Sequence, residues 1–115
     1  MKIRIILLVA MLALSNQARS AQYFFTGNSL LADCESYFDW GKVRCFNYLV
    51  GIVDAITTLR GRKDLPDDYI CIPKGVSKKQ LRKIFIKFAN ENSERLDVGA
   101  SGIVIVAYTR AFPCL

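Results

Sequence analysis

The sequence predicts a small, mainly helical domain that is exported from the cytoplasm and carries two disulfides. Three observations predict this: an N-terminal segment with the layout of a secretory signal peptide, four Cys that all follow it, and apolar residues at helical spacing in two central segments. The C-terminal segment is compatible with a helix or a strand. On the residues alone, the fold class is therefore all-α or α+β.

Residues 1–20 form the predicted signal peptide. Lys2 and Arg4 precede an unbroken apolar run over residues 5–14, and small residues around Ser20 suit cleavage by a signal peptidase. As a helix this run would reach about 15 Å, half of a bilayer core of about 30 Å. It is too short to span a membrane, so we expect a mature domain of residues 21–115 that does not insert into one.

Charge and composition exclude several classes of function. The chain carries 16 basic and 10 acidic residues, and the predicted leader holds three of the basic ones. The mature domain is therefore only mildly basic, which does not favour binding to nucleic acid. The chain has no His, so Ser-His and Cys-His nucleophilic pairs and His-containing zinc sites are excluded.

Other chemical motifs are equally sparse. The sequence has no phosphate-binding Gly loop and no cluster of acids at metal-binding spacing. We therefore expect no enzymatic activity, no cofactor and no metal, although two carboxylates that converge in the fold, as in glycosidases, stay open.

The four Cys are typical of a disulfide framework in a small exported domain. Cys34, Cys45, Cys71 and Cys114 can pair in three ways. A short turn between the first two predicted helices would bring Cys34 to Cys45. Antiparallel packing of the last two segments would bring Cys71 to Cys114. Geometry favours this pairing without excluding the other two.

The mature chain is predicted to begin with a short helix. Residues 23–25 form an aromatic, extended lead-in that packs on the core, and Asn28 caps a helix over residues 29–37.

A long central helix follows. After a turn over residues 39–42, apolar spacing predicts a helix over residues 43–60 that Gly61 closes. Apolar residues cover more than half of its circumference, which is typical of a helix packed on several sides. The narrow remaining stripe consists of Asn47, Gly51 and Asp54. Gly51 would let another element approach closely, and Asp54 could cap or bridge, although a plain solvated stripe fits equally well.

The next segments are a long loop and a second clear helix. The loop over residues 61–75 contains Cys71, so we expect a disulfide to hold it. Ser77 and Gln80 form a capping box that starts a helix over residues 78–92. One face of this helix is apolar and the opposite side is basic. Ile86 falls on the basic side and is predicted to be exposed, either as a solitary apolar residue or as the apolar centre of a partner site with a charged rim.

The C-terminal segment, residues 100–112, follows a second loop. Its β-branched run Ile103–Val106 favours a strand by propensity. The run continues to Phe112 without a breaker, which allows a buried helix, and periodicity alone does not decide between them.

The order of motifs resembles a known family. The segments that carry the resemblance are Phe25-Thr26-Gly27-Asn28, Leu30-Leu31-Ala32-Asp33-Cys34, residues 45–55 from Cys45 to Ala55, Cys71-Ile72-Pro73-Lys74-Gly75-Val76 and Ala111-Phe112-Pro113-Cys114. Over nearly the whole mature chain, this set resembles the Rap/Tai family of periplasmic immunity proteins, which protect bacteria from amidase effectors of the type VI secretion system. Asn47 stands where the family usually has a small residue. Residues 93–100 lack the Pro and His associated with that loop, which bears on whether the partner is the usual one.

The resemblance implies a fold, a location and a function. It implies an all-α domain of about four helices, commonly a homodimer in the periplasm, with the C-terminal segment helical because burial overrides propensity. It implies that the chain occludes a papain-type cysteine amidase that cuts peptidoglycan and needs no chemistry of its own. A disulfide-bonded platform suits this role, because rigidity lowers the entropic cost of binding.

The residues predicted to contact the amidase lie on the polar side of the third helix and in the loop after it. They are Lys79, Lys83, Ile86, Lys87, Asn90, Glu94, Arg95 and Asp97. Two alternative functions are a small helical chaperone of the periplasm and a binder of an envelope polymer or anionic lipid through the basic face at residues 78–87.

Overall fold

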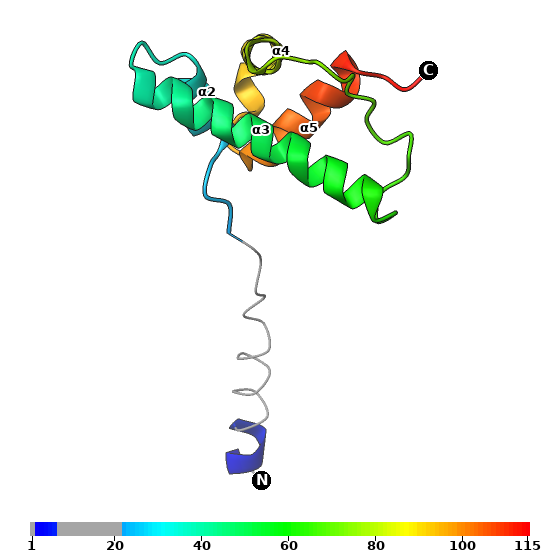
Figure 1. Cartoon of the computed structure of the whole chain (residues 1–115). Coiled ribbons are helices and arrows are strands. Elements are labelled where there is room, and N and C mark those ends of the chain that lie inside the picture. The colour runs from blue at the N-terminus through cyan, green and yellow to red at the C-terminus, as the bar shows by residue number, and fades with distance from the viewer. Residues whose placement is uncertain (1, 7–21) are drawn as a thin grey trace.

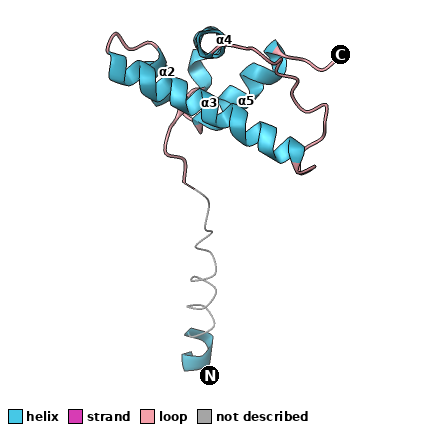
Figure 2. Cartoon of the chain, viewed as in Figure 1, coloured by secondary structure: helices cyan, strands magenta, loops and turns pink. Residues whose placement is uncertain are grey.

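The computed structural model describes residues 2–6 and 22–115, and the described part is helical. Its main helices are α2 (Gly27–Cys34), α3 (Asp39–Gly61), α4 (Lys78–Glu91) and α5 (Ala100–Ala111), with a single 3₁₀ turn, η1 (Ser93–Arg95), before α5. Figure 2 shows helices and loops and no strand in this part. The all-α prediction is confirmed. Most of the predicted leader lies outside the described residues, so the leader stays a prediction.

The long helix α3 forms one side of the domain, and the other three helices pack against it and one another (Figure 1). The largest fully buried side chains are Tyr108, Phe85, Leu30 and Leu49, one from each of the four helices. The β-branched run of α5 is helical because Ile103, Val104 and Ala107 are buried in this core. Packing therefore decides the conformation that propensity left open.

The start of α2 differs from the prediction. Thr26 rather than Asn28 is the N-cap, because its hydroxyl accepts the N–H of Ser29 while the Ser29 hydroxyl accepts the N–H of Thr26. The side chain of Asn28 instead donates to a carboxylate oxygen of Asp97 at 2.9 Å. The prediction missed this because Asp97 is distant in sequence.

The predicted turn over residues 39–42 is wrong, because α3 already begins at Asp39. The chain turns earlier, over residues 35–38, where Gly41 lies tightly against Ser36: a Cβ on Gly41 would come within 2.4 Å of the Ser36 Cβ. Asp39 in the first turn also suits the positive end of the helix. At the other end, Gly61 is the last helical residue rather than the cap.

Packing decides the open question at Gly51 in favour of the plain solvated stripe and corrects one expectation about the lead-in. Nothing approaches Gly51, since a Cβ added there would meet no atom within 4 Å, and Asn47 and Asp54 are exposed beside it. In the lead-in, Phe25 packs as expected, with its ring 5.1 Å from that of Tyr48, and the Tyr23 ring lies against Gly99. Phe24 is 97% exposed. The polar stripe of Asn47, Gly51 and Asp54 stays uncovered because the other helices pack against the opposite side of α3.

Both disulfides have the favoured pairing, Cys34–Cys45 and Cys71–Cys114. The second holds the long loop between α3 and α4 to the C-terminal tail, where the Cys71 N–H also donates to the Phe112 carbonyl. Arg60 supports the same loop by donating to the carbonyls of Asp67 and Ile70. Within the described residues, no helix is long and apolar enough to cross a membrane.

Tyr108 links the core to a pH dependence. Its buried hydroxyl donates to the Leu81 carbonyl at 3.2 Å, and burial raises the pKa of this phenol well above its ordinary value. The unfolded chain loses this proton near pH 10, while the folded chain keeps it to higher pH. The contribution of Tyr108 to the free energy of unfolding is therefore fully present below about pH 10, and above that pH it falls by about 1.4 kcal/mol per pH unit. Urea unfolding at about pH 9 and about pH 11 measures this loss. In Tyr108→Phe, we expect a smaller loss of stability between these two pH values. Tyr23→Phe, at an exposed tyrosine, is the control and should show the same loss as the unaltered protein. The same loss in Tyr108→Phe would show that Tyr108 does not cause the pH dependence.

Candidate partner-binding site

Three exposed aromatic side chains lie at the turn between α2 and α3. Tyr37, Phe38 and Trp40 are 89%, 61% and 57% exposed. The rings are ordered against one another: Phe38 stacks on Trp40 with centroids 5.8 Å apart, and Tyr37 meets Phe38 edge-on. The Arg44 guanidinium lies 4.3 Å from the centroid of the Trp40 ring. We call this group, with Val43, the aromatic hairpin.

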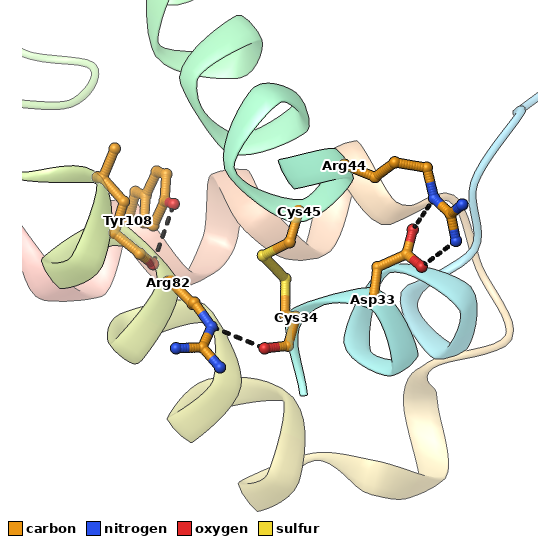
Figure 3. The surroundings of a disulfide bond; sticks show 7 residues. Asp33, Cys34, Arg44, Cys45, Arg82 and Tyr108 are labelled. Atoms are coloured by element: carbon orange, nitrogen blue, oxygen red, sulfur yellow. Dashed lines mark hydrogen bonds and ion pairs between the residues drawn. A yellow bond between two sulfur atoms is a disulfide. The ribbon is translucent and has the colours of Figure 1, made fainter. Parts of the chain in front are cut away.

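Buried interactions hold the base of the aromatic hairpin (Figure 3). Cys34 and Cys45, which bond the end of α2 to the second turn of α3, are fully buried. Asp33, also buried, accepts two hydrogen bonds from Arg44, at 3.0 and 2.5 Å. The hydrogen bond to Asp33 raises the pKa of Arg44, so this guanidinium stays charged. The hairpin is therefore rigid at its base while its rings face solvent.

Helix α4 supports the hairpin from a second side. Arg82 donates to the Cys34 carbonyl at 2.7 Å, as Figure 3 shows, and Asn90 donates to the Glu35 carboxylate at 2.9 Å. Arg82, Ile86 and Asn90 follow one another at intervals of four residues, so they form one stripe of α4. The two hydrogen bonds show that this stripe faces the end of α2.

This arrangement corrects the prediction for Ile86. Ile86 is half-buried and packs against the core rather than standing exposed among basic residues. The apolar face of α4 is broader than its spacing suggested. The sequence pattern divides α4 into one apolar face and one basic side, but α2 packs along the boundary between them and faces the stripe that contains Ile86. Ile86 is therefore no apolar centre of an exposed site.

The other predicted contact residues are exposed but spread along α4 and its following loop. Lys79, Lys83 and Lys87 form a basic stripe beside the one that faces α2, and Lys87 lies 4.0 Å from Glu91. Glu94 and Arg95 lie 3.8 Å apart in η1. The structure ties Asn90 to Glu35 at the end of α2 and Asp97 to Asn28 at its start, whereas Lys79 lies in the first turn of α4, at the other end of that helix from Asn90.

A hollow lies between α4, α5 and the loop that joins them. It has a volume of about 360 Å³. We call it the α4–α5 groove; it is lined by Phe88, Asn92, Arg95, Leu96, Val98, Gly102, Ile103, Val106 and Arg110. Of the predicted contacts, only Arg95 lines it. The lining is mostly apolar, and its charged members are the two Arg.

Sequence reasoning missed the aromatic hairpin. It placed Tyr37 at the end of a helix and Trp40 in a turn, and attached no role to either. The available signal was three aromatic residues within four positions, between two Cys that are 11 residues apart. Such a cluster lacks the spacing that would bury it on one helix face.

The described residues hold no evident chemical centre. No group of three His, Cys, Asp or Glu residues among them could hold a metal ion, and all four Cys are in disulfides. The described surface has three features that a partner could contact. They are the aromatic hairpin, the basic stripe of α4 and the α4–α5 groove.

Comparison with known protein families gives a match over most of the chain. The model of the family described as Rap1a immunity proteins matches residues 26–114, which includes the hairpin, α4 and the groove. Comparisons with curated proteins and with solved structures found no match.

Proposed function

Because the chain belongs to the family of Rap1a immunity proteins, we propose that it protects the cell by binding and occluding a cell-wall-degrading amidase effector of the type VI secretion system. The proposed target is a papain-type cysteine amidase in the periplasm. In this proposal the chain contributes no catalysis and acts by covering the mouth of the amidase active site.

The observation that carries the proposal is the aromatic hairpin. Trp, Tyr and Arg are the residues most often found to dominate binding energy at protein interfaces. Here Trp40 stacks on Phe38 and lies against Arg44, and Tyr37 meets Phe38 edge-on. The rings are exposed, and a buried disulfide holds their base. Aromatic side chains that are already ordered lose little conformational freedom on binding, which favours tight association.

The basic stripe of α4 and the following loop form the proposed rim of this interface. Lys79, Lys83 and Lys87 are exposed, and the hydrogen bonds of Arg82 and Asn90 make α4 and the hairpin one rigid unit. Charged residues at a rim contribute mainly to the rate of association and to the choice of partner. Glu94, Arg95 and Asp97 extend the rim beyond the end of α4.

Location and assembly belong to the same proposal. A cleaved leader over residues 1–20 would deliver the domain to the periplasm, and two disulfides suit an oxidising compartment. We also propose a homodimer, in which a second copy covers the exposed stripe of α3 around Gly51. Sedimentation velocity on the oxidised protein tests whether a dimer forms.

The proposed function is tested by calorimetry of the oxidised protein against a panel of papain-type peptidoglycan amidases, with amidase activity measured in parallel. We expect nanomolar, stoichiometric binding to at least one member and loss of its activity. Binding without loss of activity would contradict occlusion. Absence of binding to every member would contradict the amidase as target.

The hairpin assignment predicts a specific loss of affinity. Trp40→Ala removes the ring that stacks on Phe38 and lies against Arg44. We expect the affinity for the amidase to fall at least about 30-fold, which corresponds to about 2 kcal/mol. Phe24→Ala is the matched control, because Phe24 is equally aromatic and even more exposed but lies outside the hairpin. Lys83→Glu is expected to slow association and to change its salt dependence, with a smaller loss of affinity. Unchanged affinity in Trp40→Ala would show that the hairpin is not the anchor.

A further inference from the structure

We propose that the α4–α5 groove is a second binding site, which takes an apolar peptide segment of a protein partner that carries a carboxylate. This inference does not rest on the immunity role or on the aromatic hairpin. It rests on the shape of the groove, on its open floor and on the two guanidinium groups along its walls.

The floor of the groove is apolar and unfilled. Phe88, Leu96 and Ile103 line it, and Val98 and Val106 on its edges are 60% and 43% exposed. A Cβ added to Gly102 would meet no atom within 4 Å, so no side chain of the domain covers this part of α5. The volume of about 360 Å³ falls in the range of about 300–1,000 Å³ that is typical of sites for small ligands. Such a groove accommodates a few apolar side chains of a segment laid across it.

The charges on the groove walls select an anionic occupant. The Arg110 guanidinium lies 5.3 Å from the centroid of the Phe88 ring, and none of the ion pairs within residues 2–6 and 22–115 involves it. Arg95 has one carboxylate nearby, that of Glu94, at 3.8 Å. Arg110 also lines the adjoining hollow together with Glu91, whose carboxylate lies 4.0 Å from Lys87 and in no ion pair with Arg110. Since guanidinium groups pair with carboxylates through two parallel hydrogen bonds, an acidic group on the occupant would pair with Arg110.

The groove is preformed rather than created by a loop movement. The Gly27 N–H donates to the Val98 carbonyl and the Asn28 N–H to the Leu96 carbonyl, both at 3.0 Å. The side chain of Asn28 also donates to Asp97. Hydrogen bonds on both sides of Asp97 thus hold the loop that forms one wall to α2. Because this loop is already ordered, binding a ligand costs little conformational entropy.

The probe for this site is a pair of peptides, acetyl-Leu-Phe-Leu with a free C-terminal carboxylate and the same peptide as its carboxamide. Both are titrated into the isotope-labelled, oxidised protein and followed by NMR. We expect saturable shifts of the Gly102 and Val98 amide signals, with the carboxylate form binding about tenfold more tightly than the carboxamide. Arg110→Gln is expected to remove this preference while leaving apolar binding in place.

Substitutions at two glycines distinguish a blocked groove from a damaged fold as the cause of lost peptide binding. Gly102→Phe places a ring in the groove and is expected to abolish peptide binding. Gly61→Phe is the control, since Gly61 also has no atom within 4 Å of an added Cβ but lies at the end of α3. Gly102→Ala is expected to raise the melting temperature and to retain binding.

Three outcomes would overturn the proposal. In the first, the peptides shift NMR signals of the hairpin instead of the Gly102 signal. In the second, the two peptides bind with equal affinity. In the third, sedimentation and NMR of the free protein show that a second copy of the chain covers the groove. A covered groove would make this face a subunit interface rather than a peptide site.

Discussion

Replacing Cys71 and Cys114 together with Ser is expected to lower the free energy of unfolding by about 4 kcal/mol, the entropy of closing a loop of this length. The bond joins residues 43 apart in sequence and connects a long loop to the C-terminal tail. Neither segment has helical hydrogen bonds of its own to replace this constraint. For a domain of this size, such a loss lowers the melting temperature by roughly 15–30 °C.

The measurement is thermal and urea unfolding of the double variant under oxidising conditions. Cys34→Ser with Cys45→Ser is the comparison: it opens a loop of 11 residues, worth about 3 kcal/mol by the same argument, but also places two hydroxyls in a fully buried position. Figure 1 places the C-terminus and the α2–α3 turn at opposite ends of the domain. Any Cys71→Ser/Cys114→Ser protein that still folds should therefore keep its hairpin affinity. An unchanged melting temperature would show that this bond does not stabilise the domain.

Gly27→Ala is expected to be the most damaging single-methyl change in the domain, at about 2–3 kcal/mol. A Cβ at Gly27 would lie 2.2 Å from the Ile103 Cδ1 and 2.9 Å from the Leu96 carbonyl oxygen. The Ile103 side chain can move away, but the Leu96 carbonyl belongs to the backbone and accepts the Asn28 N–H. The start of α2 and the loop before α5 would therefore have to separate.

Gly51→Ala is the matched control for this prediction. Gly51 is also helical, but an added Cβ there meets no atom within 4 Å, so the change should stabilise α3 by about 0.5–1 kcal/mol. Urea unfolding of both variants measures the difference. Equal effects of the two changes would mean that the contact between Gly27 and Leu96 does not constrain the fold. Since Leu96 and Ile103 also line the α4–α5 groove, the Gly27→Ala variant is further expected to weaken peptide binding there.

Part of the site was accessible from sequence because its signals are local. The capping box of Ser77 and Gln80 starts α4 as predicted, and a short turn brings Cys34 to Cys45. The basic stripe of α4 is exposed as its spacing indicates. The hairpin was not found, because the exposure of its rings depends on how the chain turns before α3 and on which helices pack around that turn, where Gly41 lies against Ser36.

The sequence by itself determined the helical periods of α3 and α4, the capping box, the favoured cysteine pairing and the absence of His chemistry. These features depend on residues close together in the chain or on composition. Only the tertiary structure decided that the β-branched run of α5 is a buried helix, that Ile86 is half-buried against the core, and that the other helices of the same chain leave Gly51 uncovered. The physical reason is the same in each case: a pattern identifies which face of a helix can be buried, but burial itself depends on where distant helices pack.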